Sequence, residues 1–222
     1  MLFGISVAVS LYCILKTRQT HQWNRWDTLF LLSSWEMFNF KVWQHALAPV
    51  TGHGYEIAAL LCLGFSVWYA QRRGIEIGYS MPAGELGRIV RTLAILAVVI
   101  IPIGLWLGFI TGSAKPDWSA VIPTIAEYIL FVGTIEEVVF RGIVLNLLKR
   151  SMKTWLALLI TTILFATIAT HIAGYGIFPN WRYVGMAFIA GLAYGAIYLE
   201  TGSIIAPILL HGLVDALWHL LF

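Results

Sequence analysis

Three charged side chains lie within nine residues, 134–142, of one long apolar stretch, residues 119–148: Glu136, Glu137 and Arg141. A charge near the centre of a bilayer costs about 3 kcal/mol or more, so a stretch that carries three needs a reason. Arg141 follows Glu137 by four residues, so the two share a helical face and can pair. Glu136 is turned about 100° from that pair and must face a cavity, a polar helix or water. The three either serve chemistry or form an ion-pair cluster that only fixes helix packing.

Two other apolar stretches carry histidines that could belong to the same site. The last stretch carries His211, Asp215 and His219 at intervals of four residues, which places all three on one helical face. The aspartate can orient the neighbouring imidazole. His219 is close to the end of the chain, and we expect it at the membrane interface. His171 ends an earlier stretch and becomes a candidate site residue because the other two stretches also carry polar groups.

This set of groups could activate a water molecule and stabilise an oxyanion, the minimum for hydrolysing a peptide bond. It could equally hold one divalent metal such as zinc through Glu136, His171 and His211. The sequence has no H-E-x-x-H motif, so the usual zinc-protease signature is absent. It also has no G-x-S-x-G motif, so a serine nucleophile is not indicated.

The composition excludes an ordinary soluble domain. Hydrophobic residues make up 59% of the 222 residues, charged residues 11%, and the mean hydropathy is +0.82. Soluble domains contain about 25% charged residues, so this chain has too few charges to cover a surface in water. The net charge of +3 is small and forms no basic stripe, so we expect no nucleic-acid partner. Cys13 and Cys62 lack the spacing of a metal or redox motif.

Eight stretches approach the roughly 20 apolar residues that cross a bilayer. They are residues 1–16, 28–49, 54–70, 90–112, 119–148, 155–172, 183–199 and 203–222. Basic residues cluster around Arg18, Arg72 and Lys149, and eight passes place all three clusters on the cytoplasmic side. We therefore predict an all-α membrane bundle of about eight helices with both termini on the non-cytoplasmic side. Polar residues interrupt 28–49, which could instead lie in the interface.

Two stretches have features of their own. Residues 119–148 would reach about 45 Å as one helix, longer than a hydrocarbon core of about 30 Å. We expect a bend or break at Pro123 or Gly133, with a short segment before Gly133 and a main helix after it. In 183–199, Gly191 and Gly195 have a spacing that lets helices approach closely, although chance explains it equally well.

The polar motifs resemble those of the CAAX-protease and bacteriocin-processing (CPBP) family of intramembrane proteases. Glu136-Glu137-x-x-x-Arg141 resembles its E-E-x-x-x-R signature, and His211-x-x-x-Asp215 resembles its final H-x-x-x-N/D motif. The resemblance covers about residues 119–222. The middle motif of the family usually has an aromatic residue four positions before the histidine. Here Thr167 holds that position and Phe165 lies six before His171, so either the helix is locally irregular or His171 is not the family's equivalent.

The resemblance implies a glutamate-dependent endopeptidase in the membrane. Glu136 would activate water with assistance from His171, while His211 and Asp215 would polarise the scissile carbonyl or stabilise the oxyanion. Glu137 and Arg141 would be supporting residues. Members of the family have been described both as metalloproteases and as metal-independent enzymes, so the cofactor is either none or one divalent metal. The expected partners are the lipid bilayer and a membrane-anchored protein or peptide, cut near its C-terminal anchor or in a precursor.

The resemblance also divides the chain. Residues 1–112 carry no recognised motif and 113–222 hold the catalytic core, and together they form one compact membrane domain, predicted to lie in a prokaryotic cell membrane. Two other functions stay open. A scaffold or immunity protein could keep the fold without catalysis. A transporter or proton relay would also use intramembrane Glu, His and Asp, although we find no internal repeat of the kind typical of transporters.

Overall fold

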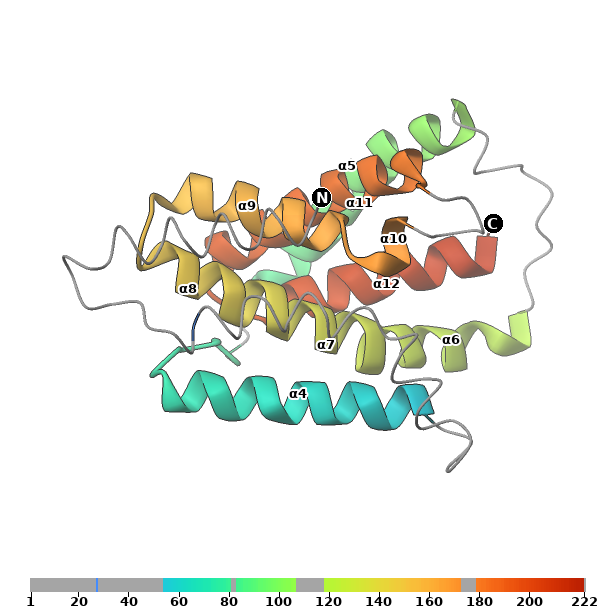
Figure 1. Ribbon diagram of the computed structural model, residues 1–222. Coiled ribbons are helices and arrows are strands. Elements are labelled where there is room, and N and C mark those ends of the chain that lie inside the picture. Colours follow the sequence, from blue (N-terminus) through green and yellow to red (C-terminus); the bar gives the residue numbers. More distant parts are fainter. Residues whose placement is uncertain (1–26, 28–53, 81–82, 107–117, 173–178, 222) are drawn as a thin grey trace.

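The computed structural model describes residue 27 and residues 54–80, 83–106, 118–172 and 179–221, and every regular element within them is helical (Figure 1). The elements are α4 (Gly54–Arg72), α5 (Glu85–Trp106), η1 (Trp118–Ala120), α6 (Val121–Glu127), η2 (Tyr128–Gly133), α7 (Thr134–Glu137), η3 (Val138–Leu145), α8 (Asn146–Lys149), α9 (Thr154–Ala166), α10 (Ala169–Ile172), α11 (Trp181–Thr201) and α12 (Ile205–Leu221). The all-α prediction is confirmed for these ranges. The predicted spans 1–16 and 28–49 lie outside them, so the count of eight stays a prediction.

Helices suited to a membrane occur in the described part of the chain. Two of its helices, α5 and α11, are long and apolar enough to cross a bilayer, and α9 and α12 are shorter apolar helices. Large apolar side chains point out of the bundle along α4 and α5, among them Leu61, Trp68, Val90, Val98 and Trp106. Exposing such an apolar surface to water is unfavourable, whereas its contact with lipid tails carries no such free-energy penalty.

The elements from η1 to α8 form one continuous helical rod (Figure 1). The break expected at Gly133 is therefore not observed. Gly133 has helical angles, φ −60° and ψ −44°, and the helix continues into α7. Pro123 is the third residue of α6, where its missing N–H removes no helical hydrogen bond. The rod instead widens into π-helical turns at η2 and η3, on either side of α7. Such turns are rare and frequently occur at functional sites.

The close contact between the rod and α12 explains the two glycines at their crossing. α12 packs against η2 and α6 of the rod and also against α5 and α11. A Cβ atom on Gly212 would lie 2.6 Å from Cα of Ile129, and one on Gly133 would lie 2.8 Å from the carbonyl oxygen of Ile208. The glycine at position 133 therefore permits a close helix crossing and not a break.

Polar caps define the ends of α11 and the start of α12. The Asn180 side chain accepts a hydrogen bond from the Tyr183 N–H at 3.1 Å, which satisfies one free donor of the first turn of α11. Gly202 ends the helix in the left-handed conformation, with φ +67°, which glycine adopts without strain. Ser203 Oγ then accepts from the Ile205 N–H at 3.2 Å. These caps set the register at which Tyr194 and His211 face each other.

One contact connects the N-terminal part of the chain to α4. Arg73 donates to both carboxylate oxygens of the buried Asp27, at 2.7 Å each, and the Tyr69 hydroxyl donates to Asp27 as well. Residue 27 therefore lies at the C-terminal end of α4. The predicted membrane topology stays a prediction.

We predict that replacing Gly212 with Ala lowers the free energy of unfolding by about 1–3 kcal/mol, because the new methyl group would overlap the backbone of Ile129. Gly185→Ala in α11 is the matched control, since a Cβ there meets nothing within 4 Å. That control should leave stability unchanged or raise it by about 0.5–1 kcal/mol. Reversible unfolding in detergent measures both changes. Equal stability of the two variants would contradict the close crossing.

Candidate active site

A buried charged cluster connects the rod to α11 and α12. Arg141 Nη1 donates to Glu137 Oε1 at 2.8 Å, which confirms the pair predicted from their spacing. His211 Nδ1 lies 2.8 Å from the same oxygen. Arg141 Nη2 donates to the carbonyl oxygen of Gly191 in α11 at 2.9 Å. Because all three charged or ionisable side chains are buried, these bonds replace the water that the groups lose.

Aromatic rings enclose the Arg141 guanidinium. Its Cζ atom lies 4.3 Å from the ring centroid of Phe165 and 5.5 Å from that of Tyr194. A cation over an aromatic face is attracted by the ring's negative face, more strongly where water is excluded. A Cβ on Gly191 would meet the Phe165 ring at 2.9 Å and Arg141 Nη2 at 3.1 Å. Gly191 therefore makes room for these two side chains where α11 packs against α9.

Glu136 reaches the same histidine from the other side. Its Oε2 atom lies 3.9 Å from His211 Nε2, while Glu137 lies at Nδ1. The Glu136 Oε2 atom is buried, and among the described residues it has no hydrogen-bond partner. The 100° turn between the two carboxylates thus places them at opposite ring nitrogens of one imidazole. Within the described ranges, Glu136 is the carboxylate of the pair that no Lys or Arg side chain contacts.

His211 is held on all sides. Asp215 Oδ2 lies 3.4 Å from Nε2, one helical turn further along α12, as the spacing predicted. The Tyr194 ring stacks on the imidazole with centroids 4.6 Å apart and planes at 21°. Both ring nitrogens therefore face carboxylate oxygens, and the ring face is covered. The orientation of His211 is fixed before any substrate binds.

The structure explains the unusual spacing before His171. α9 ends at Ala166, Thr167 leaves helical geometry with φ −106° and ψ 16°, and the chain resumes as the short helix α10. Because of this irregularity the His171 side chain lies next to Phe165. Its Nδ1 is 3.0 Å from the Phe165 carbonyl oxygen, and the two rings contact edge to face with centroids 5.0 Å apart. The first of the two alternatives, a locally irregular helix, is the one observed. The catalytic role of His171 stays a prediction.

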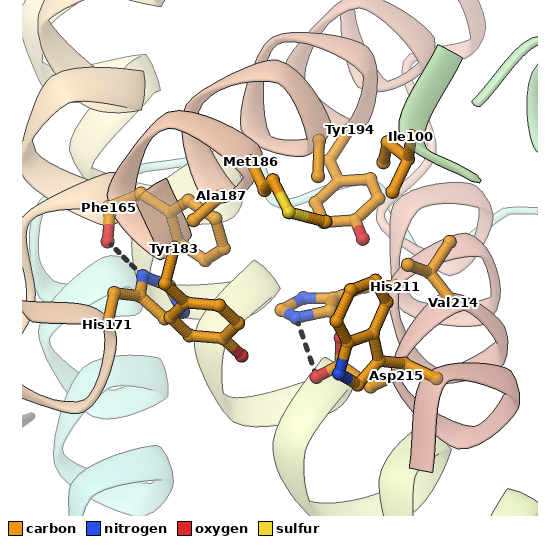
Figure 2. Close-up of a pocket in the computed structure, with 12 residues that line it drawn as sticks. Ile100, Phe165, His171, Tyr183, Met186, Ala187, Tyr194, His211, Val214 and Asp215 are labelled. Carbon is orange, nitrogen blue, oxygen red and sulfur yellow. Dashed lines mark hydrogen bonds and ion pairs between the residues drawn. The ribbon is translucent and has the colours of Figure 1, made fainter. Parts of the chain in front are cut away.

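A pocket lies where these groups meet, with a volume of about 50 Å³, enough for a few water molecules (Figure 2). His171, His211 and Asp215 line it, together with Tyr183 and Tyr194 of α11 and apolar side chains, among them Phe165, Met186, Ala187 and Val214. Glu136 adjoins it through His211. His219 is exposed near the Tyr128 ring and takes no part.

The predicted metal ligands Glu136, His171 and His211 do not form a ligand set. In the ranges that the structure describes, no three His, Cys, Asp or Glu side chains are grouped so that they could hold a metal ion. The Phe165 ring contacts both His171 and His211 edge to face. The geometry found here therefore does not fit a bound metal, and no step below uses one.

Two tyrosines of the site were missed by the sequence analysis. Tyr183 contacts His171 edge to face at 5.3 Å, and Tyr194 stacks on His211. Their spacing of 11 residues, close to three helical turns, was a signal that both share one face. It could not reveal the partner of that face, since aromatic residues in an apolar helix usually face lipid or other helices.

We predict that Arg141→Met lowers the free energy of unfolding by about 3–5 kcal/mol, because it leaves the Glu137 carboxylate buried without its cation. Arg91→Met is the matched control. Arg91 also pairs with a glutamate, Glu200, but both side chains are largely exposed, so its loss should cost at most about 1 kcal/mol. Unfolding in detergent would compare the two, and similar losses would show that the buried pair does not hold the site together.

The comparisons with known proteins point to the family that the motifs suggested. Residues 117–217 match the model of the family described as "Rce1-like: Type II CAAX prenyl endopeptidase Rce1-like". No curated protein and no solved structure matches the chain. The matched range contains Glu136, Glu137, Arg141, His171, His211 and Asp215. Over residues 117–217, just under half of its length, the chain therefore matches the Rce1-like type II CAAX prenyl endopeptidase family, and two of its described helices are long and apolar enough to cross a membrane.

Proposed function

We propose that the chain is an intramembrane endopeptidase that hydrolyses a peptide bond of a membrane-anchored protein or peptide, with Glu136 as the base. The observation that carries this proposal is the arrangement around His211. One buried glutamate, Glu137, is neutralised by Arg141 and holds the imidazole, while a second, Glu136, lies at the opposite nitrogen without a hydrogen-bond partner among the described residues. An ion pair that served packing alone would not require this second carboxylate.

The two glutamates differ in their capacity to accept a proton. Oε1 of Glu137 already accepts from Arg141 and contacts His211, so a proton on this carboxylate would weaken both contacts, although its Oε2 is buried without a hydrogen-bond partner among the described residues. Glu136 makes no such bonds, and its side chain is slightly more open, with 12% of its surface exposed against 0% for Glu137. A base must exchange protons with water and with the leaving group. These properties support Glu136 as the base and Glu137 as a positioning residue.

His171 would assist as a hydrogen-bond acceptor. The Phe165 carbonyl oxygen can only accept a hydrogen bond, so His171 Nδ1 must carry the proton of the pair they form. In the neutral ring Nε2 then has a free lone pair. This nitrogen can orient the attacking water by accepting one of its hydrogens, while the water gives its other proton to Glu136.

The reaction then follows from these positions. The water oxygen bonds to the carbonyl carbon, its proton passes to Glu136, and the C=O electron pair moves onto the oxygen. The C–N bond breaks when Glu136 returns the proton to the leaving nitrogen. His211, held between Glu137 and Asp215, places its ring beside the developing negative charge and stabilises it electrostatically.

An apolar groove beside the pocket supports a membrane-anchored substrate. It lies between α5 and α12, is lined by Leu93, Leu96, Ala97, Ile100, Ile101, Val214, Leu217 and Trp218, and shares Ile100, Val214 and Trp218 with the pocket. The groove exposes almost no polar atoms. An apolar segment of the substrate can lie there while an adjacent peptide bond reaches His171 and His211.

We predict that Glu136→Gln lowers the cleavage rate by about 10²–10⁴-fold while the protein still folds, because the amide cannot accept the proton of water. Wild-type protein and the variant would be reconstituted in lipid with a library of peptides carrying membrane-anchored C-terminal tails, and new termini identified by mass spectrometry. Glu127→Gln, an exposed glutamate on the same rod, is the control and should cleave normally.

Each other outcome of that assay has a defined meaning. Cleavage by Glu136→Gln at the wild-type rate would contradict its role as base. Cleavage by the wild type that a chelator abolishes would require a metal despite the geometry described above. If neither protein cleaves although both are folded, the scaffold function gains support, and flux through proteoliposomes that depends on Glu136 would support a transporter.

We predict that Ala97→Phe raises KM for an anchored peptide several-fold and leaves kcat within about twofold, because the added ring fills the groove without touching the carboxylates. Ala94→Phe is the matched control, one turn earlier on α5 and exposed on the outside of the bundle. Steady-state kinetics on the best peptide of the library separate KM from kcat. Equal effects of the two variants would show that the groove does not bind the substrate.

A further inference from the structure

The proposed reaction needs a hydrogen-bond donor at the oxygen of the scissile carbonyl, where negative charge develops. The imidazole of His211 is poorly suited to donate this bond directly. Its Nδ1 lies 2.8 Å from Glu137 Oε1, and its Nε2 lies 3.4 Å from Asp215 Oδ2 and 3.9 Å from Glu136 Oε2. Any proton on either nitrogen is therefore directed at a carboxylate. Donation to the substrate would require giving up one of these contacts.

The second histidine does not supply the donor either. His171 Nδ1 uses its proton on the Phe165 carbonyl oxygen, which leaves Nε2 as an acceptor in the neutral ring. Asp215 as a carboxylate accepts hydrogen bonds only. Among the other polar side chains that line the pocket, three carry donors: the phenols of Tyr183 and Tyr194 and the indole N–H of Trp218.

Tyr194 is the best placed of these three donors, since Tyr183 and Trp218 each take part in further interactions. Its side chain is 1% exposed, and its ring is fixed by stacking on His211 at 4.6 Å and by the edge of Phe165 at 6.3 Å. No other described residue forms a hydrogen bond with its hydroxyl, although this group lines the pocket. Figure 2 shows the ring above His211 with the hydroxyl pointing toward the side of the pocket formed by Val214. A donor fixed in this way pays little ordering entropy when charge develops.

One neighbouring charge, that of Arg141, favours Tyr194 as a donor. The Arg141 guanidinium lies 5.5 Å from its ring centroid, and Arg141 is itself fixed to the carbonyl of Gly191, one turn earlier on α11. A positive charge beside the ring draws electron density from the phenol and makes its O–H a stronger donor to an anion. Tyr183, by contrast, is half-buried in the first turn of α11 and its ring contacts His171.

We propose that Tyr194 is a catalytic residue whose hydroxyl donates a hydrogen bond to the carbonyl oxygen of the scissile peptide bond and to the oxyanion that forms there. This inference rests on the proposed peptidase function and adds to it a group that no recognised motif contains. The hydroxyl keeps its proton throughout, so the proton balance of the reaction through Glu136 is unchanged. The glutamate–arginine–histidine cluster thereby acts twice, by holding His211 and by polarising Tyr194.

The test compares Tyr194→Phe with Tyr198→Phe in full-length protein reconstituted in lipid, using the peptide that the wild type cleaves fastest. Tyr198 lies one turn further on α11, outside the pocket, and its hydroxyl bonds Asn146 and the Ile77 carbonyl oxygen. Tyr194→Phe should lower kcat by about 10²–10³-fold with KM changed less than about threefold. Tyr198→Phe should leave both within about threefold even if its melting temperature falls.

A third protein separates catalysis from packing. Incorporation of 3-fluorotyrosine at position 194 keeps the ring and strengthens the hydroxyl as a donor, so kcat should return to at least the wild-type value. Wild-type cleavage by Tyr194→Phe would overturn the inference, as would a loss confined to Tyr183→Phe or a fluorotyrosine variant as slow as Tyr194→Phe. If the wild type cleaves no peptide, the peptidase proposal fails and this inference fails with it. If the wild type cleaves and Tyr194→Phe cleaves equally well, only this inference fails.

Discussion

The site depends on one carboxylate oxygen, Oε1 of Glu137, which contacts both Arg141 and His211 at 2.8 Å. The glutamate and the arginine lie on the rod and the histidine on α12, while Arg141 also bonds α11 through Gly191. Three helices are thus joined by charged groups inside an apolar bundle. Since removing any one partner leaves a buried charge uncompensated, the arrangement tolerates little change. It also positions His211, Tyr194 and Glu136 relative to one another without substrate.

This cluster can form because the helices approach closely where it lies. Gly133 and Gly212 remove the side chains that would separate the rod from α12, and Gly191 leaves space for the Arg141 and Phe165 side chains. The π-helical turns on both sides of α7 widen the rod around the two glutamates. Wide turns are less stable than α-helical ones and are retained where function needs them. The glycines and the π-helical turns therefore make room for the same side chains that the charged contacts hold, those of Glu137, Arg141 and His211.

Phe165 has a comparable role on the apolar side of the site. Its ring contacts the guanidinium of Arg141 and the rings of His171, Tyr194 and His211. Its carbonyl oxygen also fixes the proton on His171 Nδ1. One residue thus fixes the orientation of His171 and also contacts the ring of His211.

The sequence by itself determined the helical class, the apolar character and the polar positions, because these follow from composition and from spacings of four residues along one helix. Contacts between residues four apart in one continuous helix could be predicted. They are the ion pair of Glu137 with Arg141 and the contact of His211 with Asp215. Only the tertiary structure decided that Glu137 and Glu136 flank one imidazole, that Tyr194 stacks on it, and that the chain bends at Thr167 to bring His171 to Phe165. These contacts join residues of different helices or depend on a local break in a helix. They are fixed by the way the helices pack, and the residue pattern along a single helix does not contain that information.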